Sequence, residues 1–238
     1  MTPEYKTDPV ESHWRGMYRV GGISAIAMLC IMILQIIIFS IWPPPGSVEE
    51  LFALFQQNWL LGLLSMDLLY LLNNALLIPI YLALYISLKR EAESAMLISL
   101  ALGLVGIAAY FASNTSFEML SLSNQYAAAE SEAWRIALLG AGQAMLETYR
   151  GTIFDVYYVL NAVSLLILAV VMLRSRVFGK TTAWFALAAG ILMIIPSTAG
   201  AVGLVFSLLS LAPWAVFLVL TARRWLSVPD FSAEVRLK

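Results

Sequence analysis

The feature that most constrains this chain is its series of long apolar runs. A helix that crosses the hydrocarbon core of a bilayer, about 30 Å thick, needs about 20 mainly apolar residues. Six runs approach or exceed this length, and most of them end at prolines or at paired basic residues. The predicted spans cover residues 20–42, 60–88, 95–117, 151–173, 181–199 and 201–222.

The composition supports this interpretation. The chain has 238 residues, of which 61% are hydrophobic and 12% are charged. Soluble domains contain about 45–50% apolar and about 25% charged residues. The predicted fold class is therefore all-α, a polytopic membrane bundle of six transmembrane helices.

The basic residues predict the orientation of the bundle. Cytoplasmic loops carry an excess of Lys and Arg. If both termini are cytosolic, only Arg135 and Arg150 of the 14 basic residues lie outside. The inner basic residues are then Lys6, Arg15, Arg19, Lys89, Arg90, Arg174, Arg176, Lys180, Arg223, Arg224, Arg236 and Lys238. The predicted topology is N-in and C-in, with a membrane domain over 20–225 and cytosolic tails over 1–19 and 226–238.

Two segments, 43–59 and 118–150, are predicted to lie on the outer side. In the first, Ser47 and Glu50 fit the capping-box pattern S-x-x-E. The apolar residues that follow predict a short interfacial helix on the outer leaflet. In the second, apolar residues recur at helical spacing from Trp134 onward. This predicts an outer helix that either covers the mouth of the bundle or packs on the lipid surface.

Polar residues within three predicted spans fall on one face of each helix. Each of these faces carries an acid, an amide and a tyrosine at spacings of three or four residues. The second span contributes Asp67, Tyr70 and Asn74, the third Tyr110, Asn114 and Glu118, and the fourth Asp155, Tyr158 and Asn161. Buried polar groups in lipid usually face the bundle interior. These nine residues are therefore the candidate pocket residues, whereas Asn73, about 100° from Asn74, is expected at a helix contact.

The depth of these residues predicts where the pocket opens. At about 1.5 Å per residue, the carboxylates of Asp67, Glu118 and Asp155 lie about 28–35 Å above the cytosolic anchors. A second polar layer, which includes Gln35, lies about 20–24 Å above them. The inner half of each span is nearly free of ionisable groups. This asymmetry predicts an outward-facing pocket that is closed toward the cytosol.

An oxygen-rich lining suits a cation, a hard metal ion, or the head group of a polyol or an amine. The expected partners are thus the lipid bilayer and a small polar or cationic ligand, and no metal site or cofactor is assigned. The alternative is that the outer polar residues are only hydrated and the deeper ones only pair across helices. In that case the chain is a structural or partner-binding membrane protein.

Other functions receive less support from the sequence. The net charge of −1 and the lack of a basic tract argue against nucleic-acid binding. The chain has one cysteine, Cys30, and one histidine, His13, which leaves no Cys/His metal cluster and no base within a span. An intramembrane enzyme would depend on Asp67 and Asp155, and a transporter would need polar groups through the whole thickness. The sequence leaves open whether the chain is an enzyme, and it gives more support to a protein that is not one.

Three stretches carry a resemblance to a known family. They are GLVGIAAYFASNTSFEMLSLSNQYAAA, FDVYYVLN and IPSTAGAVGLVFSLLSLAPWAVFLVL. They resemble prokaryotic multi-pass membrane proteins catalogued as domain of unknown function 4386, over roughly residues 19–225. The resemblance implies a six-span helical protein of the plasma membrane. It implies no activity and supplies no functional residues.

Overall fold

The computed structural model describes residues 14–227, and in this range every regular element is an α-helix. The remainder of the predicted tails, with His13, Lys6, Arg236 and Lys238, lies outside the described residues. The helices are α2 (Arg15–Ile41), α3 (Val48–Gln57), α4 (Trp59–Ser65), α5 (Leu68–Leu88), α6 (Glu93–Ser113), α7 (Ser116–Ala128), α8 (Glu132–Tyr149), α9 (Thr152–Arg174), α10 (Lys180–Leu192) and α11 (Gly200–Leu226).

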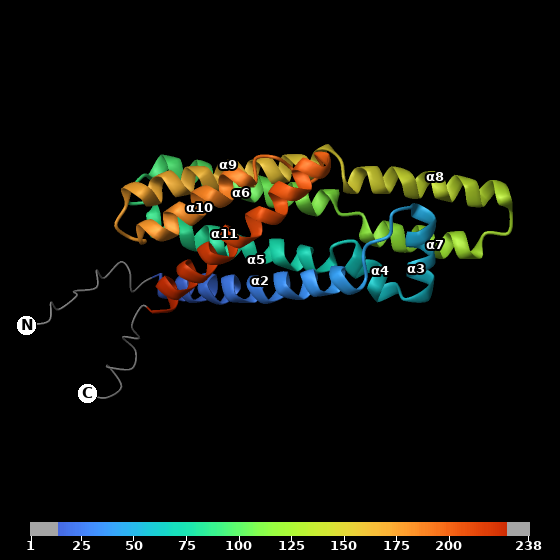
Figure 1. Cartoon of the computed structure of the whole chain (residues 1–238), viewed down its shortest axis with the longest axis horizontal. Coiled ribbons are helices and arrows are strands. Elements are labelled where there is room, and N and C mark those ends of the chain that lie inside the picture. The colour runs from blue at the N-terminus through green and yellow to red at the C-terminus, as the bar shows by residue number, and fades with distance from the viewer. Residues whose placement is uncertain (1–13, 228–238) are drawn as a thin grey trace, which may run out of the picture.

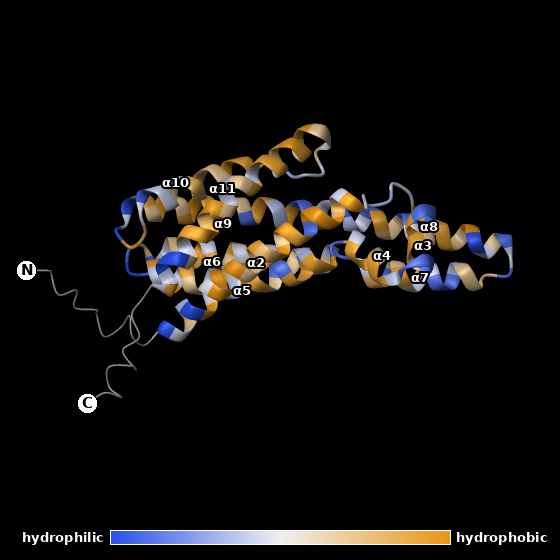
Figure 2. Cartoon of the chain, turned by 60° about the horizontal axis from the view of Figure 1, so that its bottom comes forward, coloured by the Kyte–Doolittle hydropathy of each residue, from blue (hydrophilic) through white to orange (hydrophobic). Residues whose placement is uncertain are grey.

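The helices form two regions along the long axis of the molecule (Figure 1). Helices α2, α5, α6, α9, α10 and α11 make one bundle, and α3, α4, α7 and α8 gather at one end of it. Hydrophobic residues dominate the surface of the bundle helices, including the hairpin of α10 and α11 (Figure 2). An apolar exterior of this kind suits contact with lipid.

Within residues 14–227, five helical stretches are long and apolar enough to cross a membrane. They are Arg15–Ile41, Leu68–Leu88, Glu93–Ala128, Glu132–Arg174 and Gly200–Leu226. Two of these stretches join a bundle helix to an outer helix, α6 with α7 and α8 with α9. The chain is thus an all-helical protein with several membrane-spanning candidates, one fewer than the sequence predicts.

The difference arises at the predicted span 181–199. Its helix, α10, has 13 residues and ends at Leu192, so it is about 20 Å long. Turns follow, and the backbone N–H of Ala199 bonds to the carbonyl of Pro196 at 3.0 Å. Proline has no N–H to continue a helix, and Gly200 begins α11 with a φ of 65°. Pro196 and Gly200 therefore end this run before it reaches the length of a span.

The predicted span 60–88 also contains a break. Helix α4 ends at Ser65 and α5 starts at Leu68, with Asp67 between them at φ 61° and ψ 31°. Asp67 is the only non-glycine residue with positive φ among the described residues. Aspartate tolerates this left-handed conformation better than most residues. The apolar run continues through the break, so hydropathy does not reveal it.

The outer helices share a hydrophobic core of their own. Phe52 and Phe55 of α3 are 1% and 3% exposed and pack with Met119 of α7 and Leu146 of α8. Ser47 caps α3 as the sequence predicts, accepting a hydrogen bond from the N–H of Glu50. The structure differs from the predicted interfacial helix because the apolar face of α3 packs on protein instead of lipid.

Small residues allow the bundle helices to approach closely. Ser99 of α6 and Ser164 of α9 each donate a hydrogen bond to the other's carbonyl, at 2.9 and 2.7 Å. A Cβ on Gly106 would lie 2.3 Å from Nδ2 of Asn161, and one on Gly103 would lie 2.6 Å from a tyrosine ring. These two glycines therefore allow α6 to lie close to α5 and α9.

The helices also pack closely at one end of the bundle. A Cβ on Gly21 would lie 2.7 Å from a side chain of α5, and one on Gly22 would lie 2.8 Å from Leu226 of α11. The indole N–H of Trp225 donates to Ser87 Oγ at 3.0 Å. From this end, α11 runs diagonally away from α2 (Figure 1).

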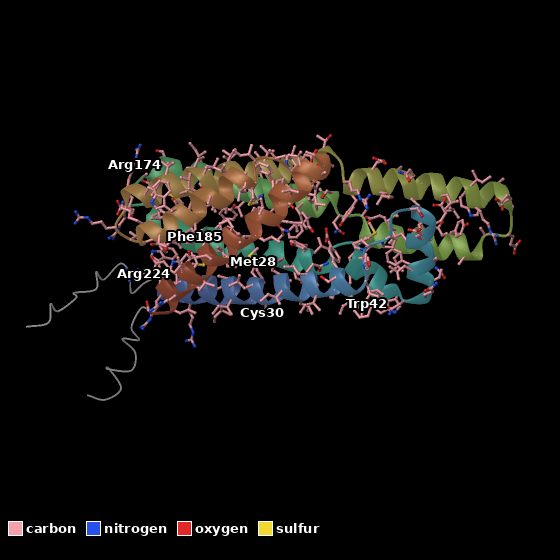
Figure 3. All side chains as sticks on the ribbon, viewed as in Figure 1. Met28, Cys30, Trp42, Arg174, Phe185 and Arg224 are labelled. Atoms are coloured by element: carbon pink, nitrogen blue, oxygen red, sulfur yellow. The ribbon has the colours of Figure 1, made fainter. Side chains whose placement is uncertain are left out.

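The same end carries basic side chains. Arg174 and Arg224 lie there, and Trp42 lies toward the opposite end of α2 (Figure 3). Trp42 is 50% exposed, which suits the aromatic belt at a membrane interface. The bundle therefore has a basic, tightly packed end and an end that meets the outer helices.

Candidate functional site

Asp67 lies where the outer helices meet the bundle. Its carboxylate accepts a hydrogen bond from the hydroxyl of Tyr149, the last residue of α8. The side-chain amide of Asn114 donates to the carbonyl of Met66 at 3.0 Å and so holds the turn before α5. Three segments distant in sequence thus converge on this left-handed residue.

The environment of Asp67 favours its protonated form. Asp67 precedes the spanning helix α5, and burial raises the pKa of its carboxyl to about 6, while Tyr149 and the charge of Arg150 act in the opposite direction. Burial disfavours the charged form because the low-dielectric surroundings solvate it poorly. A carboxyl with this pKa changes charge near neutral pH.

A cavity of about 470 Å³ begins at Asp67 and extends into the bundle. Its walls come from α2, α5, α9 and α11, with Tyr110 from α6 and Ser197 from the turn after α10. Ligand pockets typically have volumes of about 300–1,000 Å³. The cavity is therefore large enough for a small organic molecule.

Six of the nine candidate residues line this cavity. They are Asp67, Tyr70, Asn74, Tyr110, Tyr158 and Asn161. Helical spacing in the sequence grouped these residues, because those from the same helix share one face. Their role in binding stays a prediction.

The other three candidates have different positions. Asn114 ends α6, and its Oδ1 accepts hydrogen bonds from the N–H and hydroxyl of Ser116. Glu118 is exposed on α7. Asp155 is half-buried and accepts a hydrogen bond from Thr198. Only Asp67 of the three carboxylates lines the cavity, so the cavity carries one acid instead of the predicted ring.

Four atoms in the cavity wall are buried without a hydrogen-bond partner. Only six buried side-chain atoms among the described residues lack a partner, and four belong to lining residues: Gln35 Oε1, Asn73 Oδ1, Asn74 Oδ1 and Tyr110 OH. These four residues are 1–3% exposed. Unpartnered buried polar atoms cost about 1–3 kcal/mol each. Residues that line the cavity therefore carry most of this cost among the described residues.

Neighbouring hydrogen bonds identify which atoms of two of these amides lack a partner. Asn74 Nδ2 donates to the carbonyl of Tyr70 at 3.0 Å, and Gln35 Nε2 donates to the carbonyl of Leu64 at 3.4 Å. The amide nitrogens are thus used inside the protein. The remaining side-chain oxygens of Asn74 and Gln35 are hydrogen-bond acceptors.

Aromatic rings form the α6 and α9 side of the cavity. The ring centroids of Tyr110 and Tyr157 are 4.8 Å apart, and Phe154 lies 5.7 Å from Tyr157 and 6.0 Å from Tyr158. Tyr81 donates to Asn161 Oδ1 at 2.7 Å and holds that amide against the wall. Tyrosine faces attract cations electrostatically. These rings give this side of the cavity an aromatic surface.

Sequence reasoning missed several lining residues. Asn73 lines the cavity beside Asn74, instead of forming only the predicted helix contact, because the cavity spans a wide arc of α5. Ser207 and Ser210 line it from α11. Their spacing of three within an apolar run was a usable signal. Tyr157, next to Tyr158, lines it as well.

Metal ligation has little support from the side chains in this part of the chain. Within residues 14–227, no group of three or more His, Cys, Asp or Glu side chains could hold a metal ion. Cys30 is exposed on α2. The chemistry of the cavity is that of neutral amides, hydroxyls and one carboxyl.

Comparison with known proteins gives a family. The family model described as Domain of unknown function (DUF4386) matches residues 20–228. No curated protein matches the chain, and no solved structure matches it. Any function therefore has to be argued from the geometry of this chain.

Proposed function

The chain belongs to the DUF4386 family, whose function is unknown, and we propose that it binds a small hydrogen-bond-donating molecule in the cavity. The observation that carries this proposal is the group of four unpartnered, buried polar atoms on cavity-lining residues of α2, α5 and α6. Asp67 and the tyrosines favour an uncharged or cationic ligand over an anion. Among the described residues that line the cavity, no lysine or arginine is present to balance an anionic group.

The proposed setting is the plasma membrane, with six spans and both termini in the cytosol. The basic residues at the tightly packed end support this orientation. In this arrangement α10 is a short sixth span, and the cavity lies in the outer half of the bundle. The outer helices then stand above the membrane on the far side.

Two alternatives have less support. An aspartyl enzyme would need two carboxylates facing each other, but Asp67 bonds to Tyr149 and Asp155 bonds to Thr198. A transporter would need a route through the cytosolic end, where α2, α5 and α11 pack tightly around Gly21 and Gly22. A binding role without transport fits these contacts better.

The test is a thermal-unfolding screen of the full chain in detergent. The probes are ethanolamine and glycerol, with acetate as the anionic comparison. A ligand at about 100 times its Kd stabilises the folded state by about 2.7 kcal/mol, which raises the melting temperature by several degrees. We expect this rise with at least one donor probe and none with acetate.

Variants of the unpartnered groups make the screen specific. Asn73→Leu and Tyr110→Phe remove unpartnered atoms from the cavity wall. Thr221→Val removes one outside it, because Thr221 Oγ1 is also buried and unpartnered but does not line the cavity. All three variants should melt at or above the parent temperature without ligand.

Only the two wall variants should lose the ligand-dependent rise. An equal loss in Thr221→Val would contradict the proposal. The proposal would also be contradicted if no probe raised the melting temperature of the parent. In that case water alone would satisfy the hydrogen-bonding groups of the cavity wall.

A further inference from the structure

The cavity reaches the surface between two lipid-facing helices. Among its lining residues, Ile36 of α2 is 46% exposed, and Leu204 and Leu208 of α11 are 53% and 58% exposed. Residues that line a cavity and are also exposed mark its rim. The opening therefore lies on the side of the bundle, in the gap between α2 and α11.

The opening lies at the depth of the hydrocarbon core. Ile36 is six residues before Trp42, about 9 Å along the helix axis. Leu208 is 15 residues before Arg223, about 23 Å from the basic end. The hydrocarbon core is about 30 Å thick. In the proposed orientation, the rim thus faces acyl chains instead of water.

The divergence of the two helices creates this gap. Gly22 brings α2 against Leu226 at the basic end, and α11 then runs diagonally away from α2 (Figure 1). In a second view, the turn end of the hairpin of α10 and α11 points away from the other helices (Figure 2). The gap is therefore closed at the cytosolic end and open toward the outer half.

The two sides of the cavity differ in chemistry. On the α2 and α11 side, the lining is mostly apolar and includes Met28, Met32, Leu204 and Leu211, although Gln35, Ser40, Ser207 and Ser210 also belong to it. The α5 and α9 side supplies the amides and tyrosines, such as Asn74 and Asn161. A molecule in this cavity would contact apolar side chains near the opening and hydrogen-bond acceptors at the back.

From these features we propose that the ligand is an amphiphile that enters from the bilayer between α2 and α11. It has one apolar chain, which lies along the rim, and a head that donates hydrogen bonds and carries no negative charge. This inference rests on the proposed function, because it names the class of molecule that the same cavity takes. Charge complementarity with Asp67 and the carbonyl oxygens excludes a phosphate head.

The experiment uses photolabelling of the full chain in phosphatidylcholine nanodiscs. One probe is a monoacylglycerol with a diazirine in the chain and a terminal alkyne, and the other is lysophosphatidic acid with the same chain. We expect the monoacylglycerol to label the α2 and α11 segments that line the cavity. The anionic probe should label them at least about tenfold less, because its phosphate would repel the carboxylate of Asp67.

Two neighbouring substitutions separate the cavity from general lipid contact. Leu208→Trp fills the rim, whereas Leu209→Trp changes a residue that is 56% exposed but does not line the cavity. Labelling should fall severalfold in Leu208→Trp and stay at the parent level in Leu209→Trp. Melting temperatures of the two variants without probe show whether both fold.

Labelling that is equal in both variants, or equal for both probes, would overturn the inference. If ethanolamine still stabilises the parent in a Tyr110-dependent way, the proposed function survives that result and only lateral entry fails. If the soluble probes do not stabilise the protein through the cavity and the lipid probes do not label it, both proposals fail.

Discussion

The hydroxyl of Tyr149, at the end of α8, donates a hydrogen bond to the carboxylate of Asp67, which precedes α5. This bond joins the outer helices to the bundle beside the cavity that Asp67 lines. Asn114 supports the same turn through its bond to the carbonyl of Met66. The outer helices therefore contact the bundle at Asp67, whose backbone has the left-handed conformation.

Tyr149→Phe should destabilise the protein. A hydrogen bond to a charged group contributes about 1.5–3 kcal/mol, and the loss should be larger above pH 6, where Asp67 is ionised. Thermal unfolding in detergent measures the change. Tyr126→Phe is the control, since Tyr126 packs against Phe52 in the outer core. Equal melting of the parent and Tyr149→Phe at pH 8 would show that this contact contributes little.

Asp67→Asn should flatten the pH dependence of stability. The pKa of Asp67 is raised from 3.8 to about 6 in the folded protein, so proton binding favours folding. That stabilisation is fully present below pH 4 and is lost as the pH rises through 6. Asparagine keeps an oxygen for Tyr149 and tolerates the left-handed backbone.

Melting curves between pH 4 and pH 8 test this. The parent should lose stability relative to Asp67→Asn as the pH rises through 6, whereas Glu118→Gln, at an exposed site, should follow the parent. If the parent and Asp67→Asn differ by the same amount at every pH, Asp67 does not titrate in this range.

Gly106→Ala should separate α6 from α9. The added Cβ would lie 2.3 Å from Nδ2 of Asn161 and 3.3 Å from the carbonyl of Tyr157, and such overpacking costs about 1–3 kcal/mol. Gly140→Ala is the matched control, because a Cβ there meets nothing within 4 Å. It should stabilise α8 by up to about 1 kcal/mol. Chemical denaturation in detergent measures both, and a neutral Gly106→Ala would mean that Asn161 moves freely.

The helical architecture and much of the cavity follow from residue spacing. Tyr70 and Asn74 share a face of α5, and Tyr158 and Asn161 share a face of α9, so helical periodicity was enough to group them. Estimated depth along the helices could not show whether Asp67, Glu118 and Asp155 line the same cavity. Similar height along an axis does not fix the direction in which a side chain points.

The outer helices could not be placed from the sequence because lipid and a protein core are both apolar. The apolar face of α3, with Phe52 and Phe55, satisfies either environment, and its contacts with Met119 depend on long-range packing. The break at Asp67 was hidden for a related reason. Its left-handed conformation depends on Tyr149 and Asn114, which are distant in the sequence.

The short helix α10 has a mechanical consequence for the membrane. Its 13 residues rise about 20 Å, about 10 Å less than the hydrocarbon core. In the proposed six-span arrangement, the bilayer beside α10 must thin to meet the turn that leads to α11. Lipids with longer chains would pull on this edge and change the tilt of α11. The width of the gap between α2 and α11 would then depend on bilayer thickness, which makes the surrounding lipid a regulator of access to the cavity.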